Sequence, residues 1–431
     1  MNVREAFQDV LQNTVLRAIV SVERVQTGVA WNPLDKRYRS DPYPLFANLR
    51  TKDPFHRSRL INGWVLTRYD DVSAVLRDGR FLADDRKLPG FDRSQRQLLK
   101  SGVITEEEAE RRKRTAMMLR TDPPDHTRLR SLVSKAFTPK AVEALRPRIE
   151  AIVTELLDAV AERGEMDVIR DLAYPLPVIV IAEMLGLPVE DREQFKRWSD
   201  DLVLGLGIQT LDEVRRSFAA QRELAAYIRG LAEERRGEPR EDLLSALVAA
   251  EEEGDKLTDE EVFTTVSLLL VAGNETTTNL IGNGLLALLR HPHQVDLLRD
   301  SPDRLENAIE ELLRFDSPVQ ATTRFVLEDT QLDGHTVRAN QQVALLLGAA
   351  NHDPERFPDP DRLDVTRENV QPLSFGHGIH YCLGAPLARV EGRIAFGALL
   401  ERFPHLRLAT DHAEWSNNLI LRGLTSLPVM F

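Results

Sequence analysis

Apolar residues recur with the period of an amphipathic α-helix over much of the chain. The pattern is clearest in five segments, which end at proline, glycine or charged residues: 141–163, 191–202, 212–236, 258–290 and 303–315. Strand-like runs are few and short, at residues 64–67, 323–327 and 342–347. Because these runs are too scattered for regularly alternating strands and helices, we predict a mainly α fold with small β-sheets.

Two long segments, residues 81–124 and 351–384, mix proline, glycine and charges without a sustained period. Long irregular segments inside a compact domain are usually functional, so we expect a site there. Near the N-terminus, a helical stripe of apolar positions predicts a helix that packs on the body of the protein. The stripe comprises Phe7, Val10, Leu11, Thr14, Ala18, Val22 and Val25.

The 431 residues carry a net charge of −12, with 42% hydrophobic and 29% charged residues, as in a globular protein. The acidic balance argues against nucleic-acid binding, because phosphate recognition needs concentrated lysine and arginine. No run reaches the roughly 18 uninterrupted apolar residues of a transmembrane helix, and no secretion signal is recognisable. A single cysteine excludes an intrachain disulfide and fits a reducing compartment, so we expect a cytoplasmic protein.

That cysteine, Cys382, lies in a glycine-rich loop just before a helical run at residues 383–401. A lone cysteine is ordinarily a small buried apolar side chain. Here the helix N-terminus directs its N–H groups at the sulfur, which lowers the pKa of the thiol, and the glycines allow close backbone approach. The thiolate is then a nucleophile, which needs an oriented base, or a metal ligand, which needs N–H donors and an apolar cover such as Phe375.

This loop resembles the haem-binding signature of the cytochrome P450 family of haem-thiolate monooxygenases. The matching residues are Phe375, Gly376, Gly378, His380, Cys382 and Gly384. The resemblance implies the cytochrome P450 fold, a single triangular helix-rich domain, with haem b (iron protoporphyrin IX) as cofactor. It further implies that Cys382 is the axial ligand of the haem iron, that its electron donation favours O–O cleavage, and that His380 reaches a haem propionate. Phe375, Gly376 and Gly384 would also contact the haem.

A second motif, Ala272-Gly-Asn-Glu-Thr-Thr277, lies in the middle of the predicted helix at residues 258–290. At 1.5 Å per residue this helix is about 50 Å long, enough to cross the molecule. Alone, an acid and an alcohol in mid-helix favour a plain polar face. The resemblance implies the oxygen-activation segment, in which Glu275 and Thr276 pass protons to the bound oxidant and Ala272 and Gly273 adjoin the haem. This chain has Glu275 where many family members have aspartate.

His126 and Arg130, spaced i, i+4, share one face of a predicted helix. Without the other motifs, capping and a solvated cation would explain them. The resemblance implies that both residues bind haem propionates, and that Arg324, at the head of a short strand, does the same.

Glu311 and Arg314 form an E-x-x-R pair, which alone is nearly always a surface ion pair. The resemblance implies instead a buried structural network, completed by Arg362, that holds the haem-side loop.

We therefore expect an enzyme, a cytochrome P450 monooxygenase, that takes two electrons and O2 and inserts one oxygen atom into an apolar substrate by hydroxylation or epoxidation. A peroxide-driven peroxygenase on the same scaffold and a non-catalytic haem sensor are the alternatives. Glu275 and Thr276 favour the monooxygenase, because a peroxide user already has its protons and a sensor needs no proton relay.

The chain shows no flavin or iron–sulfur motif, and the stretch after Cys382 is too short for a fused reductase. We expect electrons from NAD(P)H to arrive through a separate ferredoxin and ferredoxin reductase. The resemblance implies that residues 81–119, 202–209, 319–322 and 418–421 line the substrate pocket, together with Leu268, Val271 and Ala272 of the long helix. These mostly apolar segments suit a polyketide, terpenoid, steroid or fatty-acyl compound of secondary metabolism. The resemblance begins near Asp41, so we predict an unassigned N-terminal extension at 1–40 with an amphipathic helix, and a haem-thiolate monooxygenase domain at 41–431.

Overall fold

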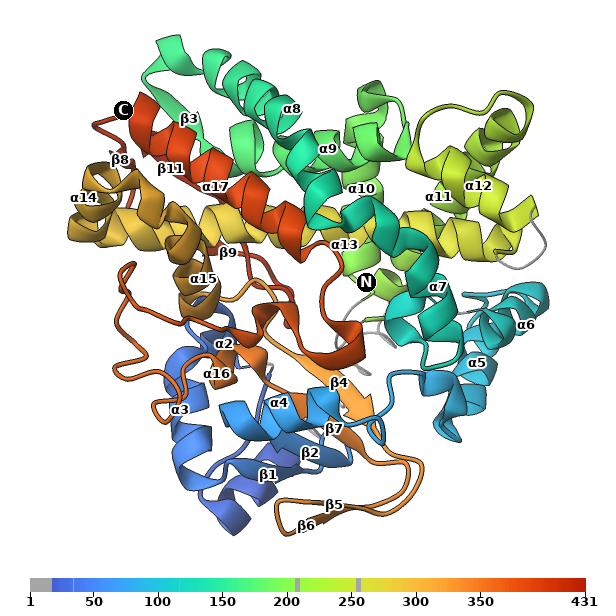
Figure 1. Ribbon diagram of the computed structural model, residues 1–431. Helices are drawn as coiled ribbons and strands as arrows, with labels where there is room; N and C mark the ends of the chain where they lie inside the picture. Colours follow the sequence, from blue (N-terminus) through green and yellow to red (C-terminus); the bar gives the residue numbers. More distant parts are fainter. Residues whose placement is uncertain (1–17, 34, 116, 206–209, 253–256) are drawn as a thin grey trace, which may run out of the picture.

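The computed structural model describes residues 18–33, 35–115, 117–205, 210–252 and 257–431. Helices dominate and strands are short, which confirms the predicted class (Figure 1). After a helix at residues 18–27, the α-helices of the described part are α2 Lys36–Ser40, α3 Tyr43–Lys52, α4 Tyr69–Arg77, α5 Gly90–Lys100, α6 Glu106–Arg114, α7 Asp125–Val133, α8 Pro139–Asp158, α9 Pro175–Leu185, α10 Arg192–Val203, α11 Leu211–Gly237, α12 Leu243–Glu252, α13 Asp259–Arg290, α14 Pro292–Asp300, α15 Leu305–Phe315, α16 Leu347–Ala350 and α17 Ala385–Arg402. The five predicted helical segments correspond to α8, α10, α11, α13 and α15.

The strands are β1 Phe55–Ser58, β2 Gly63–Leu66, β3 Glu165–Asp167, β4 Thr322–Phe325, β5 Thr330–Leu332, β6 His335–Val337, β7 Gln342–Leu345, β8 Arg407–Leu408, β9 Glu414–Trp415, β10 Leu424–Ser426 and β11 Pro428–Met430. The largest sheet has the order β1-β2-β7-β4. β7 runs parallel to β2 and antiparallel to β4, where Arg324 lies opposite Val343. The sheet forms the narrower lower part of the molecule in Figure 1, below a broad helical layer.

The long helix α13 crosses the helical layer (Figure 1). It begins with a capping box, in which Thr258 and Glu261 satisfy each other's backbone N–H groups. Its 32 residues continue to Arg290 without a break, and most of its side chains beyond the first turn are buried. Within the described ranges, no helix combines the length and the apolar character needed to cross a membrane.

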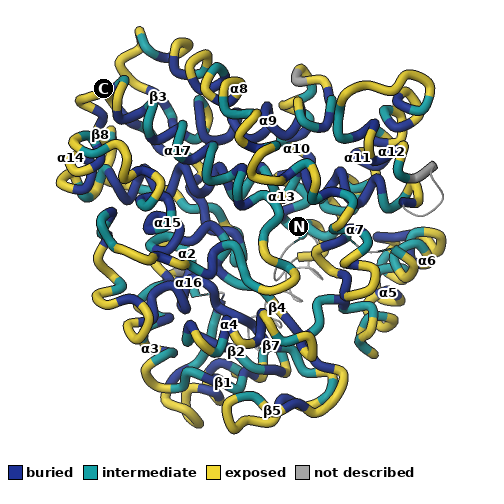
Figure 2. The backbone as a smooth tube through the Cα atoms, in the orientation of Figure 1, coloured by how far each residue is buried: buried dark blue, intermediate teal, exposed yellow. Residues whose placement is uncertain are grey.

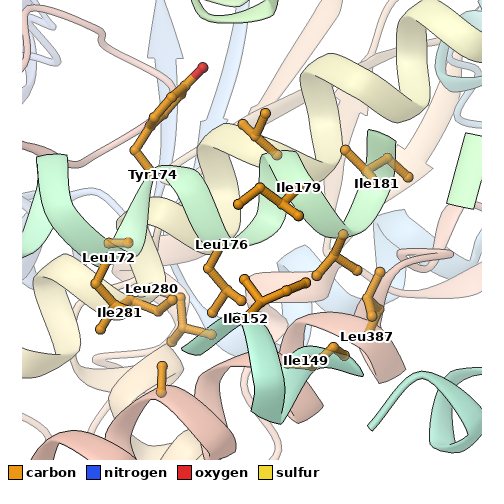
Figure 3. Packing of buried hydrophobic residues seen from close by; sticks show 14 of the residues in the cluster. Ile149, Ile152, Leu172, Tyr174, Leu176, Ile179, Ile181, Leu280, Ile281 and Leu387 are labelled. Atoms are coloured by element: carbon orange, nitrogen blue, oxygen red, sulfur yellow. The ribbon is translucent and has the colours of Figure 1, made fainter. Parts of the chain in front are cut away.

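The main hydrophobic core joins α8, α9, α13 and α17 (Figure 3). Ile149 and Ile152 of α8, Leu176 of α9, Leu280 of α13 and Leu387 of α17 belong to it. Figure 2 shows buried residues throughout this region and also in the lower part of the molecule, around α4, β2 and β7. Each fully buried aliphatic side chain stabilises the fold by about 1.5–3 kcal/mol, so this core fixes α13 relative to the start of α17.

The apolar stripe predicted for the N-terminal helix is wrong in its described part. Residues 18–27 are helical, but Ala18, Val22 and Val25 are exposed, whereas Glu23 is buried. The Glu23 carboxylate accepts a hydrogen bond from the backbone N–H of Arg59 at 2.6 Å and lies 3.3 Å from the His56 ring. These donors compensate the cost of burying the Glu23 carboxylate, so this face of the helix can lie inward. Four positions of the stripe lie outside the described residues: Phe7, Val10, Leu11 and Thr14.

Residues 81–124 are more regular than the sequence pattern indicated, because α5 and α6 both lie in this segment. The sequence of α6 has no period of apolar residues, because almost all of its side chains are charged. A small apolar cluster joins this segment to α11, with Val103 and Ile104 near Val214 and Phe218. The segment at 351–384 is irregular as predicted, apart from short single-turn helices.

Candidate functional site

The loop that carries Cys382 is held by its own backbone. The Cys382 N–H donates to the carbonyl of Phe375 at 2.9 Å, which closes the loop. Gly376 and Gly378 have φ values of +71° and +68°, in the left-handed region that favours glycine. At Gly378 a Cβ atom would lie 2.3 Å from the carbonyl oxygen of Leu76, so this position has no room for a side chain. The glycine pattern of the sequence therefore has a steric cause.

Cys382 lies directly before α17, as predicted. The backbone N–H groups of Gly384 and Ala385 hydrogen-bond toward its sulfur, and the charge of Arg130 also favours the thiolate. Burial nevertheless outweighs these effects and raises the pKa of the Cys382 thiol, so the lowered pKa expected from the helix N-terminus is wrong for the protein alone. The apolar surroundings penalise a bare thiolate, and the donors match a thiolate whose charge is shared with a metal ion.

A second group of polar side chains converges from three separate elements. His126 on α7 and His380 in the cysteine loop have ring centroids 4.3 Å apart. Among the described residues, neither ring Nε2 has a hydrogen-bond partner, although both atoms are buried. Arg324 on β4 is 7% exposed, and its Nη1 bonds only to nearby groups of the same strand, Thr322 Oγ1 and the Thr323 carbonyl.

The electrostatics of this group favour an anionic ligand. Burial, with the charge of Arg324, lowers the pKa of His380 to about 3, and burial with the charge of Arg130 lowers the pKa of His126. Burial also lowers the pKa of the Arg324 guanidinium. Buried donors and cations of this kind are stabilised by carboxylates, through charge-assisted hydrogen bonds. The residues therefore fit haem propionates.

Arg130 adjoins both the histidine pair and the cysteine, and its charge adds to the effect of burial in lowering the pKa of His126 and of His380. Its guanidinium donates to the carbonyl of Tyr381 at 2.6 Å, directly beside Cys382. The structure therefore brings His126, His380 and Arg324 together and places Arg130 against the cysteine loop.

The Ala272-to-Thr277 motif lies in the middle of α13. Ala272 is exposed although most of α13 is buried, and a Cβ atom at Gly273 would meet nothing within 4 Å. An open space therefore adjoins this part of the helix, as a flat cofactor would require. Thr276 Oγ1 donates to the Ala272 carbonyl at 2.8 Å within a continuous helix.

Glu275, the acid of this motif, is half-buried. Its Oε1 accepts a hydrogen bond from Asn279 Nδ2 at 3.3 Å. Burial raises the pKa of the Glu275 carboxyl, with a further contribution from Asp200. A raised pKa leaves more of the carboxyl protonated at a given pH than in a solvated glutamate, which suits a proton donor.

The E-x-x-R pair is fully buried, as predicted, but its third member is not Arg362. Arg314 bonds both oxygens of Glu311, at 2.7 and 2.9 Å. Arg367 Nε lies 3.2 Å from Glu311 Oε2, and its side chain is 13% exposed. Arg362 contributes only its backbone carbonyl to Arg314, while its side chain is exposed at 66%. The backbone turn at 362–367 directs the later arginine inward, which no local pattern reveals.

Two residues at the site escaped the sequence analysis. Arg389 on α17 places its guanidinium 4.6 Å from the Phe375 ring centroid and forms an ion pair with Glu310 at 2.5 Å. Its position one turn into the helix that follows Cys382 could have indicated it. Asn279 is one turn after Glu275, which is the i, i+4 spacing of facing side chains.

A glycine loop that presents a cysteine to N–H donors, with histidine and arginine donors nearby under a long central helix, defines a haem-thiolate protein. Residues 105–418 match the cytochrome P450 family. The chain is 46% identical over 371 residues to the cytochrome P450 CYP107DY1 of Priestia megaterium, which covers 85% of this chain and 89% of that protein. It is 43% identical over 424 residues to the cytochrome P450 monooxygenase PikC of Streptomyces venezuelae, with 95% and 97% covered.

The fold agrees with the sequence relationship. The crystal structure of CalO2 matches with a TM-score of 0.85 at 40% identity, over 94% of this chain and 99% of that chain. The chain therefore belongs to the cytochrome P450 family and is a monooxygenase. The predicted fold is confirmed, and family membership implies a haem-thiolate cofactor.

Proposed function

We propose that the chain binds haem b through Cys382 and uses it to hydroxylate or epoxidise an apolar small molecule. The observation that carries this proposal is the placement of donors on two sides of one site. Cys382 faces two N–H groups at the start of α17. In the second group, the ring Nε2 atoms of His126 and His380 have no partner among the described residues, and the Arg324 guanidinium is a buried charge. Thiolates and propionates require these two kinds of partner.

When bound, the haem iron with its thiolate ligand supplies the activation of O2. Thr276 and Glu275 supply the protons. The Thr276 hydroxyl, which now donates to the Ala272 carbonyl, can turn to hold a water molecule at the open side of α13. The Glu275 carboxyl can pass a proton toward that water by a change of rotamer.

Electrons reach the protein, in this proposal, from NAD(P)H through ferredoxin reductase and ferredoxin. The surface beside Cys382 supports docking of a small protein, because Ile379 and Tyr381 are 49% and 37% exposed. Exposed Arg77 lies next to this loop through its contacts with His377 and adds positive charge for an acidic partner. Such partners, together with a single reduced cysteine, favour a cytoplasmic location.

We propose a polyketide, terpenoid, steroid or fatty-acyl substrate of secondary metabolism. A vitamin D(3) 25-hydroxylase of Pseudonocardia autotrophica is 44% identical to this chain, and a 6-deoxyerythronolide B hydroxylase of Saccharopolyspora erythraea is 41% identical. Segments expected to line the pocket do meet: Val319 pairs with Leu421, and Asn418 Nδ2 donates to the Val203 carbonyl at 3.2 Å. Residues 206–209 of the expected lining lie outside the described part.

The division into an extension at 1–40 and a monooxygenase domain at 41–431 stays a proposal. In the described part of the extension, Val29 and Tyr38 share a small core cluster with Phe46. The extension therefore contacts the domain it precedes.

The reduced carbonyl complex of the purified holoprotein tests the proposal. It should show the strongly red-shifted Soret band of thiolate ligation, and Cys382→Ser should lose that band. An unchanged spectrum and full haem content in Cys382→Ser would overturn the assignment. Product formation with NADH and redox partners, compared with hydrogen peroxide alone, separates the monooxygenase from the peroxygenase, and absence of turnover in both would favour the sensor.

A further inference from the structure

One face of α13 carries three polar side chains in a row, Glu275, Asn279 and Asn283, spaced i, i+4 and i+8. Asn279 and Asn283 are each 1% exposed. Buried amides are costly unless they are hydrogen-bonded, so each must serve a partner.

The two amides have different partners. Asn283 Nδ2 donates to the backbone carbonyl of Arg422 at 2.9 Å, which ties α13 to the C-terminal loop. Asn279 Nδ2 donates to Glu275 Oε1 at 3.3 Å. Asn283 therefore supports the loop, whereas Asn279 supports the acid of the proposed proton relay.

The amide of Asn279 is fixed from its other side by Gly423. A Cβ atom at Gly423 would lie 1.7 Å from Asn279 Oδ1, so the backbone of the C-terminal loop rests directly on the amide. The loop is itself anchored, because Arg422 N donates to the Pro318 carbonyl at 2.8 Å and Ser416 N donates to the Gly423 carbonyl at 2.9 Å. Asn279 cannot swing away from Glu275 without displacing this loop.

We propose that Asn279, clamped by Gly423, is a positioning residue that holds the Glu275 carboxyl in the orientation from which it delivers protons. This inference rests on the proposed role of Glu275. It adds a support that touches neither haem nor substrate, and it couples the C-terminal loop to proton delivery.

Against the effect of burial, the hydrogen bond from Asn279 lowers the pKa of Glu275. Burial raises the pKa of Glu275, and the Asn279 amide opposes burial by stabilising the carboxylate. The other charged or titratable groups that act on Glu275 or near it are Asp200, which raises its pKa, Lys196, which lowers it, and the buried Tyr174. Removing the amide leaves these groups in place and should raise the pKa of Glu275 further.

The test uses the isosteric change Asn279→Leu, alone and combined with Glu275→Gln, in the haem-loaded enzyme with its redox partners. The alkaline limb of the rate profile should move to higher pH in Asn279→Leu, and product per NADH should fall several-fold. In the Glu275→Gln background the same change should have no further effect. Thr264→Val is the matched control: it removes a buried side-chain hydrogen bond from the same helix, about three turns before Glu275, and should leave the pH profile unchanged.

A readout independent of turnover is the Glu275 carboxyl band in infrared difference spectra of the ferrous carbonyl form. Its titration midpoint should rise in Asn279→Leu and stay in place in Thr264→Val. Should Asn279→Leu not fold, the wild-type Asn279 side-chain amide can be followed by NMR in the same diamagnetic form. Its resonance should titrate with pH and stop doing so in Glu275→Gln.

The outcomes separate the two proposals. A normal pH profile in Glu275→Gln removes the proton-relay role and this inference with it. If Glu275→Gln is impaired but Asn279→Leu keeps the wild-type profile, or adds its full effect to Glu275→Gln, only the positioning role is overturned. A pH shift in Thr264→Val as large as that in Asn279→Leu, or an amide resonance that does not titrate, also overturns it.

Discussion

The Thr276 hydroxyl is a local feature with a distinct consequence. In the protein alone it donates to the carbonyl of Ala272. Such an i to i−4 bond is weak enough to be exchanged for a bond to water when the pocket fills. Thr276 is therefore placed to move between a helix-bonded and a water-bonded state.

We predict that Thr276→Ala binds haem and substrate normally but lowers product per NADH about tenfold, with the missing electrons appearing as hydrogen peroxide. Thr276→Ser, which keeps the hydroxyl, should restore most of the coupling. Simultaneous measurement of NADH, product and peroxide decides the matter. An unchanged ratio of product to NADH in Thr276→Ala would favour the peroxygenase over the monooxygenase.

At the level of elements, the buried network of α15 connects this helix to the irregular segment before the cysteine loop. Glu311 forms ion pairs with Arg314 of its own helix and with Arg367 of the segment at 351–384. Removing a partner from a buried charge leaves it uncompensated, which is far more costly than breaking a surface pair.

We predict that Arg367→Ala lowers the free energy of unfolding by about 1–3 kcal/mol and promotes haem loss. Arg362→Ala, whose side chain is largely exposed, should change it by no more than about 0.5 kcal/mol. Urea unfolding of both holoproteins makes the comparison, with Arg362→Ala as the matched arginine control. Equal destabilisation by the two changes would contradict the assignment.

Features that depend on residues close in sequence could be predicted, whereas features that depend on distant residues could not. The Cys382 loop and the capped helix α13 depend on residues close in sequence, so their motifs sufficed. The choice between Arg362 and Arg367 depends on a tertiary turn, and the pKa of Cys382 depends on burial by distant elements. Neither could be read from spacing.

The same limit applies to α6, whose charged sequence has no apolar period. A local signal does mark its start, the capping box of Thr105 and Glu108, and Ala109 packs in the apolar cluster that Phe218 of α11 contacts. The cap and this packing define a helix that hydrophobic periodicity does not reveal.

On the scale of the whole molecule, the helix at 18–27 is joined to the sheet by a buried charged cluster. His56 Nδ1 lies 2.8 Å from Asp53 Oδ2, and its Nε2 lies 3.3 Å from Glu23 Oε2. Glu23 also accepts hydrogen bonds from Ser58 Oγ at 3.2 Å and from the Arg59 backbone. The N-terminal helix is thus held by the ion pair between the Glu23 carboxylate and the His56 imidazolium.

This cluster makes stability depend on pH. Burial lowers the pKa of His56, but its bonds to Glu23 and Asp53 outweigh burial, and the net pKa is raised. The stabilisation from His56 is therefore complete below its unfolded pKa of about 6.5 and is lost as pH rises through the higher folded value. The pKa of Glu23 is lowered, so its contribution is instead lost as pH falls below about 4.5.

We predict that the melting temperature of the wild-type protein falls as pH rises above about 6.5, and that His56→Gln, although less stable at pH 6, lacks most of this fall. The neutral amide has no proton to lose, so its difference from wild type should shrink toward alkaline pH. His412→Gln, which alters an exposed histidine, should keep the wild-type slope. Calorimetric scans of the three holoproteins between pH 5 and 9 provide the measurement, and parallel slopes for wild type and His56→Gln would show that the cluster does not set the pH dependence.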